Sequence, residues 1–278
     1  MQKFLVIDSI ARSGTTLLSA LIRTQDKCAT FDGSFVEPIL WEAKRKSLDV
    51  YKKDTMFMVG GSHSGSRLSA GLSKSDWGEI LNDLSSWDDI DKFYTRLSKK
   101  FESDIIGFRW NHCLPYISEW ISRSLDHYWV TIVRDPRDRS VSNLRTHGWS
   151  SSMCINRTRV YGKLLDNLED TKQLLVIYYE DLVANPQKTL YQIFKLMGVQ
   201  KDYPLSSLEV ENLVGANYKS YRQQGWRVKG DHRKGQAFQG IHHKSIGQYK
   251  NELGKNITVE LNSIIKEYNV YSRYRKKY

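Results

Sequence analysis

Residues 4–18 read FLVIDSIARSGTTLL, and this stretch decides the fold. Its first four residues form an apolar run, which is typical of a strand covered on both faces in a parallel sheet. A loop of small and hydroxyl-bearing residues follows, and a helix is expected over about residues 15–23. Backbone N–H groups at such a strand–loop–helix junction form an anion site. The stretch therefore predicts an α/β fold with a phosphate-binding loop.

This loop differs from the nucleoside-triphosphate loop Gly-x-x-x-x-Gly-Lys-[Ser/Thr] at two positions. Ser9 stands at the first glycine and Thr15 at the lysine. Because that lysine grips the β- and γ-phosphates, its absence favours a different anion, with Arg12 as the cation of the loop. A capped helix after a serine-rich turn is the alternative without a ligand.

Further apolar runs predict strands at residues 104–108, 128–133 and 174–178, and helices are expected at residues 116–125, 137–146, 157–170 and 187–197. Strands that alternate with helices indicate right-handed βαβ units. We therefore expect one domain over residues 1–278, with a central, mostly parallel sheet flanked by helices. Residues 41–103 are less regular and are expected to form a lid or substrate wall. Five tryptophans are either core residues or platforms for a substrate: Trp41, Trp77, Trp87, Trp110 and Trp149.

A second candidate anion site follows the strand at residues 128–133. Residues 134–142 read RDPRDRSVS, with Pro136 near a helix start and Ser142 two turns along that helix. Arg134 would lie at the carboxyl end of a strand, beside the crevice where open α/β sheets bind ligands. A surface cluster of ion pairs is the alternative for this segment.

Together these segments resemble the sulfotransferase superfamily that uses 3′-phosphoadenosine 5′-phosphosulfate (PAPS). Residues 12–18 match its 5′-phosphosulfate loop, and residues 134–142 match its 3′-phosphate motif. Residues 178–190 are similar to its Tyr-Glu-Asp-Leu-x-x-x-Pro stretch. Residues 245–253 are similar to its C-terminal Ser-x-Gly-x-Trp segment, with Tyr249 in place of Trp. The resemblance extends from residue 4 to about residue 253 in the family's order.

The resemblance implies a P-loop-like sulfotransferase that moves a sulfuryl group from PAPS to a hydroxyl acceptor, such as a small molecule or carbohydrate, without a metal. The seven histidines show no metal-ligand spacing either. The implied nucleotide site consists of Arg12, Ser13, Gly14, Thr15, Thr16, Arg134, Ser142 and Lys244. The triplet Arg233-Lys234-Gly235 resembles a 3′-phosphate contact of the cytosolic enzymes and is the alternative to Lys244.

Four residues are candidates for the chemistry. Arg12 is expected to neutralise charge on the leaving oxygen, and Arg109 resembles the basic residue of the family that meets the transferred sulfuryl group or the bridging oxygen. A hydroxyl acceptor also needs a general base. Glu37 resembles the glutamate that follows the first helix in bacterial and tyrosyl sulfotransferases, and His112 resembles, at a different spacing, the histidine of the cytosolic enzymes. A solvated glutamate, a structural histidine and a structural ion pair of Arg109 are the alternatives.

The chain carries 42 Lys and Arg against 31 acids, a formal charge of +11. This excess predicts a polyanionic partner, and nucleic acid, an acidic membrane or a phosphate-rich small ligand would each satisfy it. Two rival functions follow: a P-loop kinase, disfavoured by Thr15, and a non-catalytic module that binds nucleic acid or acidic membrane through the basic C-terminal third. The second rival leaves the nucleotide motifs unexplained, so we expect no nucleic-acid partner.

The cysteines and the N-terminus bear on the compartment. Cys28, Cys113 and Cys154 form no close pair, which predicts buried, reduced thiols rather than disulfides. No run of about 18 apolar residues is present, and the N-terminus leads into a strand pattern without signal-peptide architecture. These features predict a cytoplasmic protein.

Overall fold

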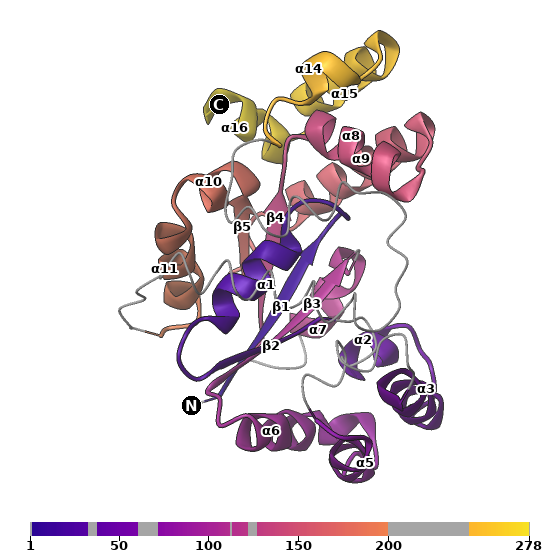
Figure 1. Ribbon diagram of the computed structural model, residues 1–278, viewed down its shortest axis with the longest axis vertical. Helices are drawn as coiled ribbons and strands as arrows, with labels where there is room; N and C mark the ends of the chain where they lie inside the picture. The colour runs from indigo at the N-terminus through magenta and orange to yellow at the C-terminus, as the bar shows by residue number, and fades with distance from the viewer. Residues whose placement is uncertain are drawn as a thin grey trace.

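The computed structural model describes residues 2–32, 38–60, 72–111, 113–121, 127–199 and 245–277. Within these ranges a single sheet has the strand order β2-β3-β1-β4-β5, and every neighbouring pair is parallel (Figure 1). The strands are β1 (Lys3–Ser9), β2 (Cys28–Asp32), β3 (Ile105–Asn111), β4 (His127–Val133) and β5 (Leu174–Tyr178). The expected α/β fold, with a central parallel sheet flanked by helices, is confirmed.

β1 lies in the middle of the sheet because its apolar run is covered on both faces. Leu5 and Ile7 belong to one core cluster, and Phe4 and Val6 belong to the other. β2 is the strand without a sequence prediction, because its sequence CATFD is short and mixes apolar with polar residues. It pairs with β3 and forms one edge of the described sheet.

One face of the sheet is covered by α1 (Thr15–Arg23), α10 (Tyr179–Ala184) and α11 (Pro186–Leu196). Leu18 and Leu21 of α1 and Phe194 of α11 are fully buried in one cluster with the side chains of β1 and β4. Burial of each such side chain stabilises the fold by roughly 1.5–3 kcal/mol. This layer fixes α1, and with it the loop that precedes α1, against the sheet.

The other face is covered by helices from three parts of the chain: α5 (Lys74–Asn82) and α6 (Ile90–Lys100), α9 (Ser151–Asn167), and α15 (Lys255–Glu267) and α16 (Asn269–Lys277). The short elements η2 (Leu114–Tyr116) and α7 (Ile117–Ile121) follow β3 on this side. Trp77 and Trp41 are buried in this core, at 0% and 5% exposure, and are therefore core residues rather than platforms for a substrate. Trp87, Trp110 and Trp149 pack against the same cluster and are only partly buried.

Residues 41–103 are more helical than their sequence suggests. The described part comprises α2 (Pro38–Ala43), α3 (Leu48–Gly60), α5, η1 (Trp87–Asp89) and α6. Capping boxes start α5 and η1, where Ser73 pairs with Asp76 and Ser86 with Asp89. Figure 1 shows α5 and α6 near the end of the sheet where β1 starts, and α6 packs on β3. A lid or substrate wall formed by this segment stays a prediction.

The opposite end of the sheet carries α8 (Pro136–His147), α14 (Tyr249–Glu252), α15 and α16 (Figure 1). α8 begins sharply because Pro136 occupies its first turn and the Asp135 carboxylate accepts from the Arg137 N–H at 2.8 Å. It ends at Gly148, whose φ of +63° is the left-handed conformation common at helix C-termini. These signals define the ends of α8, and its first turn follows directly after the carboxyl end of β4.

Cys28, Cys113 and Cys154 are buried, and none of them forms a disulfide within the described residues. Among the described helices, none is long and apolar enough to cross a membrane.

Candidate active site

The loop between β1 and α1 has the backbone of an anion-binding nest. Arg12 and Gly14, on either side of Ser13, both adopt left-handed conformations, with φ of +74° and +104°. Gly14 is the N-cap of α1 and provides no side-chain cap for the first turn. The first N–H groups of a helix have no partner within the helix and carry the positive end of its dipole. The loop therefore has a backbone geometry suited to an anion, and its role as a phosphate site stays a prediction.

Gly14 is also required by a close approach. A Cβ atom at this position would lie 2.6 Å from the Tyr179 ring, which stands at the end of β5. The phosphate loop can reach this ring only because residue 14 has no side chain. Tyr179 belongs to the Tyr-Tyr-Glu-Asp stretch of the sequence, but its contact with the loop joins residues 165 positions apart and leaves no local signal.

Arg12 and Arg134 link the phosphate loop to the end of β4. The Nε atom of Arg12 donates to Oγ of Ser142 at 2.9 Å. Nη1 of Arg134 donates to the Arg12 carbonyl at 2.9 Å, and Nη2 donates to the Ser245 carbonyl at 2.6 Å. The side chain of Asn143 adds a hydrogen bond to the Ala11 carbonyl at 3.0 Å. The two segments predicted to bind phosphate thus lie in direct contact.

Tyr179 completes this junction. The Arg134 guanidinium lies 4.7 Å from the centre of the Tyr179 ring, an arrangement that favours a cation over an aromatic face. The Tyr179 hydroxyl and Oγ of Ser245 are 3.0 Å apart. Arg134 is 6% exposed, and its Nε atom has no hydrogen-bond partner among the described residues. All four segments singled out in the sequence therefore meet at the carboxyl end of the sheet.

Arg109 approaches the same loop from β3. Its Nη1 atom donates to Oγ1 of Thr16 at 2.7 Å and lies 3.4 Å from Oγ1 of Thr15. Thr16 is exposed, and Arg109 is half-buried. The two hydroxyls hold the guanidinium against the first turn of α1. Arg109 therefore adds a second cation to the end of the helix where an anion is expected.

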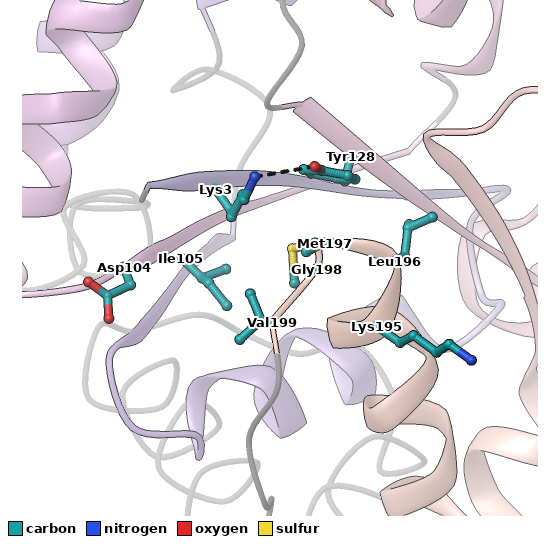
Figure 2. A pocket seen from close by; sticks show the side chains of 9 residues that line it. All are labelled: Lys3, Asp104, Ile105, Tyr128, Lys195, Leu196, Met197, Gly198 and Val199. Carbon is teal, nitrogen blue, oxygen red and sulfur yellow. Dashed lines mark hydrogen bonds between the residues drawn. The ribbon is translucent and has the colours of Figure 1, made fainter.

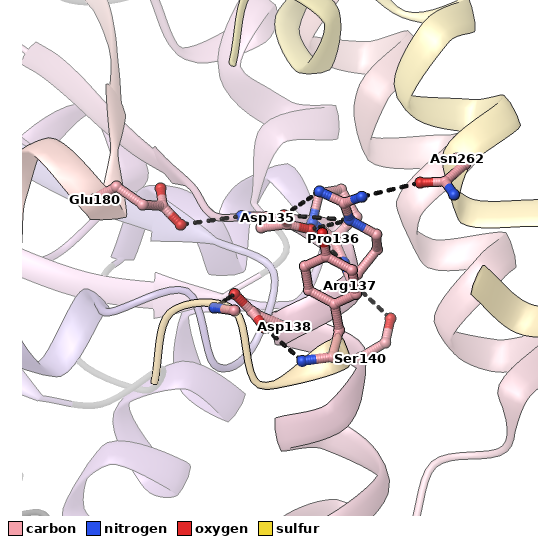
Figure 3. Close-up of polar contacts among 9 residues, drawn as sticks. Asp135, Pro136, Arg137, Asp138, Ser140, Glu180 and Asn262 are labelled. Atoms are coloured by element: carbon pink, nitrogen blue, oxygen red, sulfur yellow. Dashed lines mark hydrogen bonds and ion pairs between the residues drawn. The ribbon is translucent and has the colours of Figure 1, made fainter. Parts of the chain in front are cut away.

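The acids of the Arg-Asp-Pro-Arg-Asp segment have structural partners (Figure 3). Asp135 forms an ion pair with Arg137 at 2.7 Å, which agrees with the ion-pair alternative for these two residues. The Asp138 carboxylate accepts from the N–H groups of Gly247 and Tyr249 at 2.6 and 2.9 Å. Burial raises the pKa of Asp138. Asp138 thereby ties the C-terminal segment that carries Ser245 to the start of α8.

Glu180 lies on α10, next to the backbone at the start of α8. It is 3% exposed, and its Oε1 atom accepts from the Asp135 N–H at 3.4 Å (Figure 3). Burial raises the pKa of Glu180 to about 7. Burial is the main cause of a raised pKa at Tyr274 on α16, and the neighbouring Glu180 and Asp135 carboxylates raise this pKa further. Glu180 therefore supports the backbone next to Arg134 instead of facing the phosphate loop.

Asp8 is a further buried acid that the sequence did not single out. Its carboxylate is fully buried at the end of β1 and accepts from the N–H groups of Cys113 and Leu114 at 3.1 and 3.0 Å. The hydroxyl of Tyr161 on α9 donates to it at 3.0 Å. Burial raises the pKa of Asp8 to about 7. Asp8 thus ties the segment after β3 to the strand that precedes the phosphate loop.

Several predicted residues lie outside the described part of the chain. These are both candidate bases, Glu37 and His112, and the candidate 3′-phosphate contacts Lys244 and Arg233-Lys234-Gly235. The described site accordingly consists of Arg12 to Thr16, Arg109, Arg134 and Ser142 from the sequence prediction, joined by residues the sequence did not assign to it: Asn143, Asp138, Tyr179 and Ser245.

A groove of about 510 Å³ lies elsewhere on the molecule. It is lined by Lys3, Tyr128 and Met197, among others, at the starts of β1 and β4 and the end of α11 (Figure 2). Lys3 donates to the Tyr128 hydroxyl there at 3.3 Å. This groove is therefore at the amino end of the sheet, opposite the phosphate loop. Among the described residues no group of three or more His, Cys, Asp or Glu is arranged to hold a metal ion.

Comparison with known proteins agrees with this geometry. The family model described as "Sulfotransferase domain" matches residues 2–273. The chain therefore belongs to the sulfotransferase family of enzymes, as its motifs imply. No curated protein sequence matches it.

Solved structures with the same fold include the sulfotransferase domain from the Curacin biosynthetic pathway, with 16% identity, a TM-score of 0.57, and coverage of 96% of this chain and 97% of that one. The sulfotransferase domain of the Synechococcus PCC 7002 olefin synthase has 17% identity, a TM-score of 0.60, and coverage of 95% and 94%. Mouse sulfotransferase SULT7A1, complexed with PAP, has 11% identity, a TM-score of 0.50, and coverage of 100% and 90%. At these identities the similarity establishes the fold.

Proposed function

We propose that this protein transfers a sulfuryl group from PAPS to a hydroxyl acceptor. The observation that carries the proposal is the direct contact between the two anion-binding segments, through the bonds of Arg12 to Ser142 and of Arg134 to the Arg12 carbonyl. A donor with phosphate groups at both the 5′ and the 3′ position of one ribose needs two anion subsites close together. Ser13, Gly14, Thr15 and Thr16 would hold the 5′-phosphosulfate, and Arg134 and Ser142 the 3′-phosphate.

The fit of such a nucleotide rests on polar groups at this junction. The Nε atom of Arg134 and Oδ1 of Asn143 are buried without a hydrogen-bond partner among the described residues, and buried polar groups are ordinarily hydrogen-bonded. The start of α1 adds N–H donors and the positive end of a helix dipole. Lys244, which lies outside the described residues, is proposed as a further cation for the 3′-phosphate.

The reaction is an in-line displacement at sulfur. The acceptor oxygen forms a bond to sulfur, the bond from sulfur to the bridging phosphate oxygen breaks, and adenosine 3′,5′-bisphosphate leaves with the electron pair. By analogy with phosphoryl transfer, the protein acts mainly by positioning the reactants and by neutralising the developing charge. Arg12 and Arg109 flank the start of α1 and are the proposed cations for the leaving oxygen and the transferred group.

A hydroxyl acceptor loses a proton as the new bond forms, and a base within hydrogen-bond distance accepts it. Glu37 is the first proposal for this base and His112 the second, both from the family resemblance. The acceptor is proposed to be a small molecule or carbohydrate, with residues 41–103 contributing a wall of its pocket. Loops of this kind vary freely on one scaffold, so the fold does not identify the acceptor.

A P-loop kinase is the rival with a similar loop, and one experiment separates the two. Isothermal titration compares binding of adenosine 3′,5′-bisphosphate without metal to binding of ATP with Mg²⁺. We expect the bisphosphate to bind at least about tenfold more tightly, because Thr15 stands where a kinase loop has its lysine. Tighter binding of ATP with Mg²⁺ would favour the kinase. Absence of binding by either ligand would favour the non-catalytic module.

A further inference from the structure

A second buried guanidinium lies beneath the phosphate loop. Arg139 is one helical turn into α8 and is 3% exposed. A cavity of about 10 Å³, which is about the space of one water molecule, separates it from the loop. The cavity is lined by Ser13 and Ile10 of the loop together with Arg139, Arg134 and Tyr161.

Arg139 has no anionic partner in the described part of the chain. Its Nη2 atom donates to the neutral hydroxyl of Thr158, and its Nε atom is buried without a hydrogen-bond partner. The nearby acids are engaged elsewhere: Asp135 pairs with Arg137, and Asp138 accepts from Gly247 and Tyr249. The carboxylate of Asp8 likewise accepts from Cys113, Leu114 and Tyr161.

A buried charge without a counter-charge destabilises a fold, and removal of such a charge is often neutral or stabilising. Burial lowers the pKa of Arg139, and the neighbouring Arg134 charge acts in the same direction. Arginine nevertheless keeps its proton under ordinary conditions. Two positive charges thus lie under one loop whose backbone is built for an anion.

We propose that Arg139 is an electrostatic binding residue for the nucleotide, which attracts the phosphate groups from beneath the loop without touching them. This rests on the proposed function, because the counter-charge is the PAPS or adenosine 3′,5′-bisphosphate bound on the loop. Arg139 is only 3% exposed, and the cavity between it and the loop has about the space of one water molecule, so the attraction is weakly screened. In general, two unit charges about 10 Å apart at an effective dielectric constant of about 20 attract each other by an energy that corresponds to roughly tenfold in a binding constant.

The test compares Arg139→Met, which keeps much of the volume but not the charge, with Arg139→Lys, which keeps the charge while the lysine is protonated. Because burial lowers the pKa of a lysine, the titrations are made at mildly acidic pH. Each is titrated with adenosine, AMP and adenosine 3′,5′-bisphosphate. For Arg139→Met we expect the loss of affinity to increase along this series, from about none for adenosine to roughly tenfold or more for the bisphosphate. Arg139→Lys is expected to stay within about threefold of the wild type for all three ligands.

Thermal melting without ligand separates this role from a merely structural one, because loss of a structural residue would lower the melting temperature. The proposal expects the melting temperature of Arg139→Met to equal or exceed that of the wild type, because a buried unpaired charge has been removed. A lower melting temperature, a failure to fold, an equal affinity loss for all three ligands, or a charge-retaining variant that behaves like Arg139→Met would overturn it. If the wild type binds none of the nucleotides, the proposed function fails instead.

Discussion

The guanidinium of Arg12 reaches the hydroxyl of Ser142, 130 positions further along the chain, at 2.9 Å. One residue belongs to the predicted 5′-phosphosulfate loop and the other to the predicted 3′-phosphate motif. The two predicted anion subsites are therefore in direct contact, and a change in either residue is expected to affect both.

Ser142→Ala tests this coupling. Loss of the hydroxyl removes one proposed donor to the 3′-phosphate and the partner that orients Arg12. We expect binding of adenosine 3′,5′-bisphosphate to weaken by about tenfold, the scale of one hydrogen bond to a charged group. AMP, which lacks the 3′-phosphate, is expected to lose less, and calorimetric titration of both ligands measures the difference. Ser152→Ala, an exposed serine on α9, is the control. Equal losses for the two ligands would contradict the assignment of Ser142.

Arg12→Ala and Arg109→Ala separate the proposed cations. Removing one preorganised charge-stabilising donor lowers turnover by about 10²–10³-fold. We expect a loss of at least about 10²-fold for Arg12→Ala, with weakened but measurable binding of the bisphosphate product. Single-turnover transfer from labelled PAPS measures the rates once an acceptor is found. Near-normal transfer by Arg12→Ala, with a large loss in Arg109→Ala, would make Arg109 the cation for the leaving oxygen.

Gly14→Ala tests the close approach of the loop to Tyr179. The new methyl group would occupy a left-handed position, with φ +104°, and lie 2.6 Å from the ring. Left-handed strain and overpacking together predict a loss of about 2–4 kcal/mol in the free energy of unfolding. Gly148→Ala is the matched control, since its φ is +63° and a Cβ there meets nothing within 4 Å. Its expected loss is about 1 kcal/mol. Urea unfolding measures the free energy of unfolding of both variants. A similar loss in both would show that the Tyr179 ring moves aside to make room for the new methyl group.

The base is tested by Glu37→Gln and His112→Asn. A positioned base contributes roughly 10²–10⁴-fold to the rate, so Glu37→Gln is expected to lose that much turnover. Its affinity for adenosine 3′,5′-bisphosphate should change little, because the acceptor attacks from the far side of sulfur. His112→Asn should then give the smaller loss. The reverse ranking would make His112 the base, and full activity of both variants would return both residues to structural roles.

Asp8 predicts a pH dependence of stability. Burial raises its pKa from 3.8 to about 7 in the folded state. Between these values the folded chain holds a proton that the unfolded chain has released, so the free energy of unfolding falls as pH rises from about 4 to 7. For one group shifted by about three pKa units the fall is at most about 4 kcal/mol.

Asp8→Asn is expected to flatten this slope, measured by chemical unfolding at several pH values. Glu180, whose pKa is also raised to about 7, contributes in the same direction. Glu180→Gln should therefore remove a separate part of the slope. An unchanged slope in Asp8→Asn would show that its carboxyl group is ionised in the folded protein at these pH values.

The strongly patterned elements were predictable from sequence. α1 and β5 have the expected boundaries, and the starts and ends of β1, β4, α8 and α11 differ from the prediction by at most two residues. Continuous apolar runs and helix-start signals are local, so a single sequence carries them. The start of α5 has a capping box, Ser73 with Asp76, that could have been recognised. β2 could not be recognised from sequence, because it is a strand through its pairing with β3 rather than through its own composition.

The residues of the site likewise divide into those that the sequence could identify and those that only the fold brings together. Its two anion-binding segments are sequence motifs, so Arg12, Gly14, Arg134 and Ser142 could be named in advance. The groups that join the segments depend on contacts between distant parts of the chain. The Tyr179 ring against Gly14 and the Asp138 carboxylate on Gly247 are such contacts. Arg139 stands inside a predicted motif, but its burial without an acid emerges only when α8, α9 and α16 pack together.

The central position of β1 has a consequence for synthesis on the ribosome. β1 emerges before both of its neighbours in the sheet, β3 and β4, which begin at Ile105 and His127. At about 5–20 residues per second, the ribosome needs roughly 5–20 s to supply the first of these partners. During that interval the FLVI run has no sheet to join. The nascent chain is therefore a candidate client for chaperones that shield apolar segments, and slower translation through residues 10–110 should increase its aggregation.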